Sequence, residues 1–418
     1  MITSISSAIM DQNNHMKVMS IVGARPNFMK VASLARAIER HNGEERHPRI
    51  EHTIVHTGQH YDEQMSDLFF KELDIPKPHY NLEVGSGSHA AQTAQIMERF
   101  EPVLLTEQPD VLLVVGDVNS TIACALVATK ARYNGSSRRP RPLVAHIEAG
   151  LRSRDRSMPE EINRILTDAL SDLLFVTEQD ALDNLEREGI VRGKVHFVGN
   201  VMIDTLISHR EKARNLNTLE AVSEQCNMAL KEKLTPALHQ KNARYGLVTL
   251  HRPSNVDTAD ALGPLMDCMR KIAMKIPLIF PLHPRTKNNL VQFGLLGPGD
   301  QQESILYTKP LGYLEFLNLL LGASLVLTDS GGIQEEATFL QVPCITLRNN
   351  TERPVTMTLG TNYLVGTDPD RILQTAFAVI DGNKKKSFIP LLWDGQAGAR
   401  IIDIIARQMV GTPIPVAF

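Results

Sequence analysis

The chain has 418 residues, with 44 Lys and Arg against 47 Asp and Glu, four Cys and one Trp. At about 150 residues per domain, this length predicts two or three domains with cores of their own and excludes a disulfide-stabilised miniprotein. A formal net charge of −3 with 22% charged residues excludes a protein that binds nucleic acid through a global positive field. Any anionic ligand must therefore be bound by a local cluster of cations.

The cysteines and the apolar runs indicate a reducing compartment. Cys124, Cys226, Cys268 and Cys344 are widely spaced, without a C-x-x-C pair or a zinc-ligand spacing, so we interpret them as reduced thiols. No stretch approaches the ~20 apolar residues of a membrane helix, which predicts a cytoplasmic protein without membrane contact. Residues 1–15 lack the features of a signal peptide, and we expect a disordered leader there.

Short apolar runs rich in Val, Ile and Leu alternate with longer amphipathic stretches along the whole chain. This alternation is typical of βαβ units around a parallel sheet and predicts an α/β protein with two doubly wound, Rossmann-like domains. The predicted strands are 17–23, 52–56, 111–115, 143–147, 173–176 and 195–198 in the first half, and 246–250, 278–281, 305–307, 325–328 and 344–347 in the second.

A polar, mostly helical stretch over about 204–244 separates the two series of strands and predicts a domain boundary near 199–207. We expect an N-terminal domain over 16–203, a C-terminal domain over 204–380, and a helical segment over 381–418 that packs back on the N-terminal domain. Ligands of doubly wound folds bind outside the carboxyl ends of the strands. The predicted active site therefore lies in the cleft between the domains.

The first predicted strand ends in the glycine turn of GARPNFMK, and a helix is predicted over 28–40. Backbone N–H groups at the start of a helix bind anions, and Arg25 and Lys30 add charge-assisted contacts to phosphate oxygens. A tight βα turn with two solvated cations is the alternative interpretation. The block HTGQHYD follows the next strand and is interpreted as a polar wall of the cleft.

Carboxylates follow two further strands and begin one helix. Asp117 lies in GDVNST, where Ser120 is expected to cap the next helix, and Glu148 lies in HIEAGLRS. Glu160 and Glu161 lie in MPEEINR. A turn residue is the alternative for Asp117, and helix capping is the alternative for the two glutamates. Taken together, Asp117, Glu148 and Glu160 are the usual equipment for moving protons at a carbon centre.

The second half contains two histidines at strand ends and a Ser-Gly-Gly turn. TLHRPSN and PLHPR place His251 and His283 at the same topological position, each near an Arg, which fits diphosphate recognition better than two core histidines. In LTDSGGIQEEA a strand breaks at Ser330 and opens a helix, which predicts a second anion site. Glu336 is expected to accept ribose hydroxyls, and NNTERP adds Arg353.

With these blocks the chain resembles the non-hydrolysing UDP-N-acetylglucosamine 2-epimerases, which have the two-domain GT-B architecture. The resemblance covers nearly the whole chain after Lys17, through GARPNFMK, TGQHYDEQ, VVGDVNST, HIEAGLRS, MPEEINR, GNVMID, HRPSN, LTDSGGIQEEA and NNTERPVT. It implies that the catalytic residues are Arg25, Lys30, Asp117, Glu148, Glu160 and His251. It implies that UDP is bound by Arg25, His283, Phe316, Ser330, Gly331, Gly332, Glu336 and Arg353, with sugar or regulatory contacts at Gln59, Arg164 and Arg252.

The implied reaction is reversible C2 epimerisation of UDP-N-acetylglucosamine, by elimination of UDP to 2-acetamidoglucal and re-addition. The C2 proton is not adjacent to a carbonyl, so its removal requires that the anomeric C–O bond to UDP breaks as well. Inversion then needs acid/base groups on two faces of the sugar. The resemblance implies a homodimer whose partner is a UDP-N-acetylhexosamine, with no metal, no nicotinamide cofactor and no nucleic acid.

Several alternatives remain beside this reaction. Close relatives act on UDP-2,3-diacetamido uronic acids, and these motifs do not define the contacts to C3 and C6 of the sugar. A hydrolysing 2-epimerase would release UDP and N-acetylmannosamine, although the HRPSN block argues against it. A GT-B glycosyltransferase or a nucleotide-sugar sensor is suggested by the fold alone. Pro253 and Ser254 stand where many bacterial members carry Arg and Glu near an activating second substrate site, so the chain departs from the pattern for allosteric activation.

Overall fold

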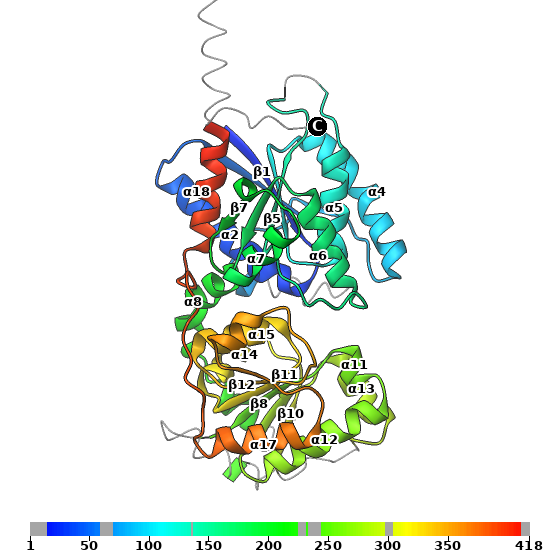
Figure 1. The fold of residues 1–418 in the computed structure, drawn as a ribbon, viewed down its shortest axis with the longest axis vertical. Helices are drawn as coiled ribbons and strands as arrows, with labels where there is room; N and C mark the ends of the chain where they lie inside the picture. Colours follow the sequence, from blue (N-terminus) through cyan, green and yellow to red (C-terminus); the bar gives the residue numbers. More distant parts are fainter. Residues whose placement is uncertain are drawn as a thin grey trace, which may run out of the picture. The chain divides into compact units, whose positions relative to one another are not determined.

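The computed structural model describes residues 15–58, 70–134, 137–224, 231–232, 244–296 and 304–410. The chain divides into two compact units, one formed by Met1–Thr205 together with Leu391–Phe418 and the other by Leu206–Pro390. Each unit contains one parallel sheet with helices packed against it (Figure 1). The predicted α/β class is therefore confirmed.

The sheet of the first unit has seven parallel strands in the order β3-β2-β1-β4-β5-β6-β7. Every residue of the central strands β4 and β5 is buried. Such continuous burial arises because helices cover both faces of a parallel sheet. The strands are β1 (His15–Val22), β2 (Arg49–His56), β3 (Tyr80–Asn81), β4 (Val111–Val115), β5 (Leu143–Ile147), β6 (Leu173–Val176) and β7 (Val195–Phe197).

The helices of the first unit follow the strands along the chain and form two groups. α4, α5 and α6 pack against one another in this order, and α18 packs beside α2 although the two are far apart in sequence (Figure 1). α8 begins in the first unit and ends in the second. The helices are α2 (Arg25–Gly43), α4 (His89–Glu107), α5 (Asn119–Lys130), α6 (Pro159–Leu170), α7 (Gln179–Arg187), η1 (Arg192–Lys194), α8 (Val201–Arg214) and α18 (Ala397–Val410).

Asp204 attaches the C-terminal helix to the rest of the first unit. Its buried carboxylate accepts hydrogen bonds from the Ser33 hydroxyl (2.9 Å) and from the backbone N–H groups of Ala397 (3.2 Å) and Gly398 (2.7 Å). Burial raises the pKa of Asp204, and the three donors act in the opposite direction. These contacts explain why the chain from Leu391 onward belongs to the first unit.

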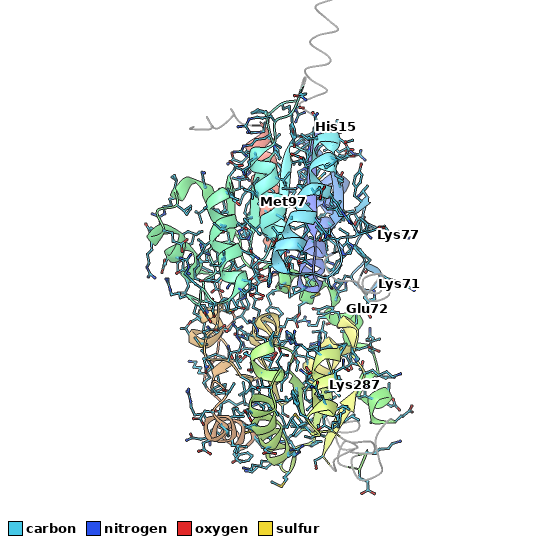
Figure 2. All side chains as sticks on the ribbon, turned by 90° about the vertical axis from the view of Figure 1, so that its right-hand side faces the viewer. His15, Lys71, Glu72, Lys77, Met97 and Lys287 are labelled. Carbon is cyan, nitrogen blue, oxygen red and sulfur yellow. The ribbon has the colours of Figure 1, made fainter. Side chains whose placement is uncertain are left out.

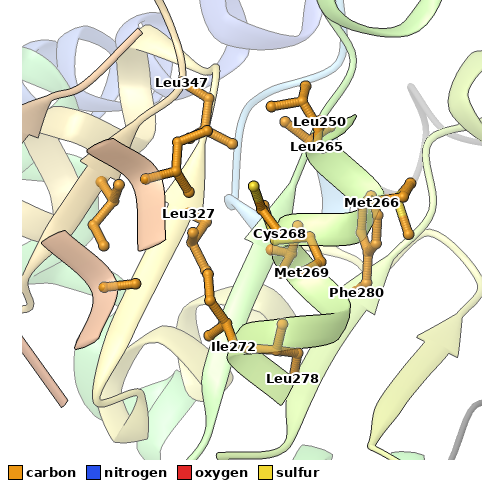
Figure 3. Packing of buried hydrophobic residues seen from close by; sticks show 14 of the residues in the cluster. Leu250, Leu265, Met266, Cys268, Met269, Ile272, Leu278, Phe280, Leu327 and Leu347 are labelled. Carbon is orange, nitrogen blue, oxygen red and sulfur yellow. The ribbon is translucent and has the colours of Figure 1, made fainter. Parts of the chain in front are cut away.

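The sheet of the second unit has six parallel strands in the order β10-β9-β8-β11-β12-β13. Its core joins these strands to α12, whose Leu265 and Met269 pack with Leu278 and Leu327 (Figure 3). The strands are β8 (Gly246–Thr249), β9 (Leu278–Pro281), β10 (Ile305–Thr308), β11 (Leu325–Thr328), β12 (Cys344–Thr346) and β13 (Asn362–Leu364). The helices are α9 (Thr218–Ser223), α11 (Pro253–Val256), α12 (Ala259–Ala273), α13 (Pro284–Gln292), α14 (Tyr313–Gly322), α15 (Gly331–Leu340), α16 (Pro354–Thr358) and α17 (Pro369–Ile380).

Each sheet has one point at which its strand order reverses. In the first unit this point lies between β1 and β4, and in the second unit it lies between β8 and β11. Loops on the two sides of such a point leave the sheet in opposite directions, which opens a crevice at the carboxyl ends of the strands. The residues that follow these four strands are thus the first candidates for a functional site.

The start of α2 differs from the prediction. The helix begins at Arg25 rather than at residue 28, because Pro26 suits the first helical turn and the Asn27 side chain accepts the Ala24 N–H at 3.0 Å. His15, which we expected in the leader, is the first residue of β1. The leader over residues 1–14 lies outside the described part of the chain.

Two further predictions differ from the structure. Ser120 does not cap α5, since the helix begins at Asn119 and the Ser120 hydroxyl bonds to that of Thr57 at 2.8 Å. The short strands β3 (YN) and β13 (NYL) were not predicted, because both contain Asn and neither is a continuous apolar run. Of the four cysteines, Cys226 lies outside the described residues, and the other three are free and buried.

Charged side chains project from the outside of both units. Figure 2 shows Lys71 and Lys77 on the first unit and Lys287 on the second, and all three are exposed. Within the described ranges no helix is both long and apolar enough to cross a membrane.

Candidate active site

The start of α2 lies at the reversal point of the first sheet. Asn27 fixes it there, because its side-chain amide accepts the Ala24 N–H and donates to the Val115 carbonyl at the end of β4 (2.7 Å). Arg25 is the first residue of α2, and only its backbone is described. The backbone N–H groups of the first helical turn thus face the carboxyl ends of β1 and β4, as an anion site requires.

Lys30 and Glu148 form a buried ion pair beside this turn. Their side chains are only 6% and 3% exposed, and the Lys30 ammonium bonds directly to the Glu148 carboxylate. Gly116 lies against the pair, since a Cβ there would approach Lys30 Nζ to 2.7 Å and Glu148 Oε2 to 3.4 Å. Its φ of +68° also favours glycine. A residue larger than glycine at position 116, directly after β4, would therefore displace the ion pair.

Glu148 has an unusual backbone conformation. Its φ of +74° lies in the left-handed region, which costs a residue other than glycine about 1–3 kcal/mol and is concentrated at functional sites. The backbone N–H groups of Glu148 and Ala149 hold the turn by donating to the Phe175 carbonyl at 3.0 and 3.1 Å. The Glu148 carboxylate, which follows β5, is thus positioned by a turn that is strained but held by two backbone hydrogen bonds.

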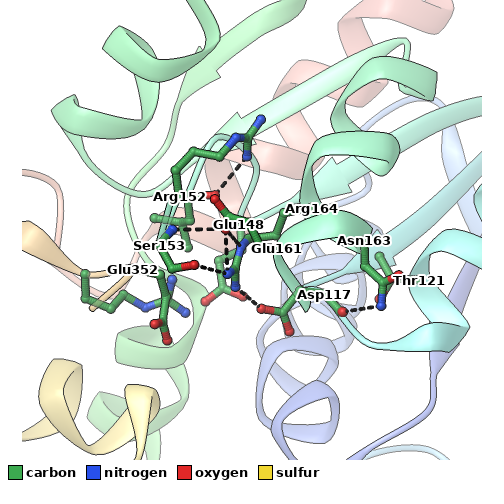
Figure 4. Close-up of polar contacts among 12 residues, drawn as sticks. Asp117, Thr121, Glu148, Arg152, Ser153, Glu161, Asn163, Arg164 and Glu352 are labelled. Atoms are coloured by element: carbon green, nitrogen blue, oxygen red, sulfur yellow. Dashed lines mark hydrogen bonds and ion pairs between the residues drawn. The ribbon is translucent and has the colours of Figure 1, made fainter. Parts of the chain in front are cut away.

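Asp117 is paired with Arg164 of α6. Arg164 also bonds to Glu161 through Nε (3.0 Å) and Nη2 (2.8 Å), and Figure 4 shows Asp117, Glu161 and Ser153 converging on its guanidinium group. The Asp117 side chain is 29% exposed, whereas those of Glu161 and Arg164 are buried. Asn163 adds a hydrogen bond to the Asp117 carbonyl at 2.9 Å. Asp117 is therefore a positioned carboxylate that solvent still reaches.

Glu160 and Glu161 have different environments although they are neighbours. Glu161 accepts the backbone N–H groups of Ser153 (2.9 Å) and Arg154 (2.8 Å). Burial alone would raise the pKa of Glu161, but these bonds and Arg164 outweigh burial and lower the pKa. Glu160 is half-buried in the first turn of α6, and its carboxylate makes no hydrogen bond or ion pair within the described residues. Glu161 is thus engaged in holding the loop after β5, whereas Glu160 is not.

A second charged pair lies under these loops. His146 of β5 and Asp168 of α6 are 0% and 1% exposed, and His146 Nδ1 lies 2.6 Å from Asp168 Oδ1. Arg152 lies 2.8 Å from the same Asp168 carboxylate and also bonds to Glu188. Burial alone would raise the pKa of Asp168, but His146 and Arg152 lower it.

Sequence reasoning did not identify Asn27, His146 or Asp168. A usable signal was present on α6, where Glu161, Arg164 and Asp168 have the i, i+3, i+7 spacing of one helix face. That face is buried. Charged residues on a buried face indicate partners on neighbouring loops, because unpaired charges there are too costly.

The reversal point of the second sheet is organised by Asp329, which sequence reasoning also missed. This fully buried carboxylate accepts the backbone N–H groups of His251 (3.0 Å) and Arg252 (2.9 Å) and the side-chain amide of Asn255 (3.2 Å). Burial opposes ionisation, but the His251 side chain at 3.0 Å and the backbone donors lower the pKa of Asp329. The end of β11 thus fixes the HRPSN loop after β8.

His251 and His283 lie side by side at the carboxyl ends of β8 and β9. Their ring centroids are 5.9 Å apart, and the His251 side chain is 42% exposed. His283 Nδ1 accepts the Arg285 N–H at 3.2 Å, which leaves the histidine at the N-cap of α13. The two histidines therefore stand together on an accessible edge, as their shared topological position predicted.

The helix α15 begins directly after β11. Ser330 is its N-cap but makes no side-chain cap bond, so the first N–H groups of α15 have no capping side chain. Gly331 is required by its surroundings, since a Cβ there would lie 2.5 Å from Glu352 Oε1. Ser330, Gly331 and Gly332 are all half-buried. This helix start, like that of α2, meets the requirements of a phosphate site.

Arginines on the loop after β12 flank this helix start. Arg353 Nε lies 2.9 Å from Glu335 Oε1, and Glu352 bonds to Arg348 at 2.8 Å. Arg252 lies 4.0 Å from Glu352. Burial acts against the charge of Glu352, but Arg348 and Arg353 hold its pKa far below the ordinary value.

Glu336 is the exception among the carboxylates of this edge. It is 2% exposed, and burial raises its pKa to about 8. Its neighbour Glu335 contributes to the same shift. Phe316, the aromatic candidate, is half-buried on α14 and packs against the core below. Gln59 lies outside the described residues, and no group of His, Cys, Asp and Glu suited to a metal occurs among the residues that the structure describes.

The chain is similar to known proteins over most of its length. A family model described as UDP-N-acetylglucosamine 2-epimerase matches residues 43–406. A UDP-N-acetylglucosamine 2-epimerase of Methanocaldococcus jannaschii is 41% identical over 93% of this chain and 99% of that protein. The UDP-2,3-diacetamido-2,3-dideoxy-D-glucuronate 2-epimerase of Pseudomonas aeruginosa is 38% identical over 94% of this chain and 100% of that protein. A crystal structure of the M. jannaschii enzyme with UDP-GlcNAc and UDP superposes with a TM-score of 0.80 at 40% identity, covering 94% of this chain and 100% of that one.

Proposed function

The chain belongs to the UDP-N-acetylglucosamine 2-epimerase family, and on this premise we propose that it catalyses the reversible, non-hydrolysing C2 epimerisation of UDP-N-acetylglucosamine to UDP-N-acetylmannosamine. The observation that carries the proposal is the set of carboxylates that follow β4 and β5 and begin α6 in the first unit. Asp117, Glu148 and Glu160 lie on three neighbouring elements, and cations hold the first two in place. Carboxylates positioned in this way transfer protons at carbon.

The chemistry assigns separate tasks to the two units. In the first step a carboxylate of the first unit takes the C2 proton, the C–H electron pair forms the C1–C2 double bond, and the C1–O bond breaks with its electrons leaving on UDP. His251, His283, Arg353 and the start of α15 stabilise the departing diphosphate, because they present cations, imidazoles and N–H groups. In reverse, UDP adds to C1 of 2-acetamidoglucal while a second acid delivers a proton to the opposite face of C2.

The three carboxylates supply the two faces with one group to spare. Glu148 is buried beside Lys30, Asp117 is partly exposed beside Arg164, and Glu160 is half-buried. The three carboxylates therefore differ in burial and in the partner that holds them. We propose that Glu148 and Asp117 act as the proton-transferring pair, with Glu160 assisting, and that Lys30 and the start of α2, including Arg25, contact the substrate.

A uronic acid substrate is the second candidate. The P. aeruginosa relative, a UDP-2,3-diacetamido-2,3-dideoxy-D-glucuronate 2-epimerase, is nearly as similar as the N-acetylglucosamine enzyme of M. jannaschii. Both reactions break the same C2–H and C1–O bonds. The two candidates therefore differ in substituents at C3 and C6, and parallel assays with both nucleotide sugars separate them.

Incubation of the purified protein with UDP-N-acetylglucosamine in deuterated water tests the proposal. Deuterium should enter C2 of both epimers while free UDP stays far below the mannosamine epimer. Free UDP that accumulates in step with free N-acetylmannosamine would instead identify a hydrolysing enzyme. Substrate recovered without label and without epimer would refute epimerisation.

The family resemblance also leads us to propose a cytoplasmic homodimer. Light scattering of the purified full chain measures the mass directly, and twice the chain mass of 46.5 kDa is the expected result. A mass equal to that of one chain at the concentration of the activity assay would contradict the dimer.

A further inference from the structure

His146 and Asp168 join the loops that carry the proposed catalytic carboxylates. His146 Nε2 lies 2.8 Å from the Gly116 carbonyl, one residue before Asp117. Asp168 Oδ2 accepts the Gly150 N–H at 3.0 Å, two residues after Glu148. Asp168 itself lies on α6, the helix whose first turn contains Glu160. One buried pair thus contacts all three carboxylate-bearing elements.

The hydrogen-bonding capacity of each group shows which atom donates and which atom accepts. A carbonyl oxygen only accepts, so His146 Nε2 must donate to Gly116. The Asp168 carboxylate accepts from Gly150 and faces Arg152, and it therefore also accepts from His146 Nδ1. Both ring nitrogens of His146 are thus engaged, one by Asp168 and one by Gly116, where solvent does not reach.

Through these bonds the pair of His146 and Asp168 holds two loops together and is more than an isolated contact in the core. Gly116 has φ +68°, Glu148 has φ +74° and Gly150 has φ +79°, so both loops leave the sheet through left-handed turns. Glycine adopts this conformation without strain, whereas Glu148 keeps it only where surrounding contacts determine it. The His146 and Asp168 bonds attach to the peptide groups at these turns, and they are buried, so water cannot replace them.

We propose that His146 is a positioning residue, which, held by Asp168, fixes the Gly116 carbonyl and thereby the Asp117 carboxylate relative to Glu148. The proposal rests on the epimerase function proposed above. It predicts that loss of the His146 contact to Gly116 impairs proton transfer more than nucleotide binding, because His251, His283, Arg353 and the start of α15, which are proposed to stabilise the diphosphate, belong to the second unit. A misplacement of about 1 Å can cost ~100-fold in rate.

Two substitutions separate the contacts of His146. In His146→Asn the shorter amide retains a donor for Asp168 but does not reach the Gly116 carbonyl. In His146→Gln the longer amide reaches Gly116 but loses the link to Asp168. We expect H146N to lower kcat for C2 epimerisation about 10–100-fold, with KM and the UDP dissociation constant within about twofold of the wild type. We expect H146Q to recover most of that loss.

His41 offers a matched control in the same unit. It is also buried, and its Nε2 lies 3.0 Å from the Pro48 carbonyl, near the last turn of α2 rather than at the reversal point. His41→Asn therefore removes an equivalent buried contact to a carbonyl away from the carboxylates. We expect H41N to lower the unfolding temperature while kcat of the folded protein stays near the wild-type value.

The outcomes are distinguishable. Wild-type protein without C2 exchange overturns the proposed function and this inference with it. If the wild type epimerises but H146N matches H41N in kcat, only the positioning role is overturned, and His146 serves stability alone. Should H146N fail to fold, two other variants are compared: the single variant Asp168→Asn and the double variant Asp168→Asn with His146→Asn. The neutral amide at position 168 leaves no buried carboxylate without its partner. Arg152 keeps its bond to Glu188 in both variants. A kcat that is equal in these two variants likewise overturns the inference.

Discussion

The reversal points of the two sheets have the same topology, but their carboxylates have different partners. In the first unit the carboxylates face cations that are themselves buried, as in Lys30 with Glu148 and Arg164 with Asp117. In the second unit the buried carboxylate Asp329 directs its charge to backbone N–H groups and to His251. The strand ends are thus equivalent as scaffolds, and the loop residues decide the chemistry.

This difference shows how one sheet arrangement supports two tasks. Proton transfer needs carboxylates of defined charge and position, and the first unit supplies them through salt bridges and strained turns. Diphosphate binding needs N–H groups and cations, and the second unit places both at one strand edge. The start of α15 meets this need because its N-cap, Ser330, leaves the first N–H groups without a capping side chain.

The largest expected effect concerns the proton-transferring carboxylates of the first unit. Asp117→Asn removes the charge of a proposed proton-transfer group, and kcat for C2 epimerisation should fall by about 10²–10⁴-fold. The fold should persist, because Arg164 keeps two bonds to Glu161. Calorimetric titration should give a UDP dissociation constant within about twofold of the wild type. A D117N variant that turns over within a factor of ten of the wild type would show that Asp117 does not transfer the proton.

The next largest effect concerns diphosphate binding by the second unit. Arg353 is assigned to the diphosphate, and its loss should weaken UDP binding about 10–100-fold, or roughly 1.4–2.7 kcal/mol. Because Arg353→Gln alone leaves Glu335 as an unpaired buried charge, the informative variant is Arg353→Gln with Glu335→Gln. Titration of this double variant with UDP measures the effect. Glu335→Gln alone is the control, and equal affinity of the single and double variants would remove Arg353 from the UDP site.

The pH dependence of stability should have opposite signs at Glu161 and Glu336. The pKa of Glu336 is raised to about 8, so the folded protein retains a proton that the unfolded chain releases near pH 4.5. Its stabilising contribution is therefore lost as the pH rises from about 4.5 through 8. Glu336→Gln should remove this loss, so its unfolding temperature should exceed that of the wild type more at pH 9 than at pH 5.

Glu161 provides the comparison within the same measurement. Its pKa is lowered, so its contribution is present above the ordinary carboxylate value and is lost as the pH falls through the folded value. Glu161→Gln should therefore destabilise the protein near pH 7 and approach the wild type in acid. Unfolding curves of both variants that run parallel to the wild type at every pH would contradict these assignments.

The fold was largely predictable from the sequence. Strands buried on both faces are continuous apolar runs, and β4, β5, β6, β9 and β11 have the predicted bounds. Turn motifs after those strands also located His251, Glu148 and Ser330. The predicted start of the first helix lay after the observed start at Arg25, because the prediction did not include the preference of proline for the first helical turn.

The partners of the site residues were not predictable in the same way. His146 appeared as one residue of an apolar strand, and only the packed structure places Asp168, 22 residues later, within hydrogen-bond distance. Asp329 lay inside a recognised motif, but its backbone partners are 77 and 78 residues away. Periodicity reports which face of an element is buried, and it does not report which element covers that face.

The smallest expected effect sharpens the account of the second unit. Arg285 lies near His283, but Asp257 already binds its guanidinium through two hydrogen bonds of 2.6 and 2.5 Å. Since the pair neutralises itself, Arg285→Ala should change the UDP dissociation constant less than about threefold, and as a surface pair it should change the free energy of unfolding by less than ~1 kcal/mol. Titration with UDP beside the Arg353 variants measures the difference. If Arg285→Ala weakened UDP binding as much as loss of Arg353, then Asp257 would not keep Arg285 from the diphosphate, and Arg285 would belong to the UDP site.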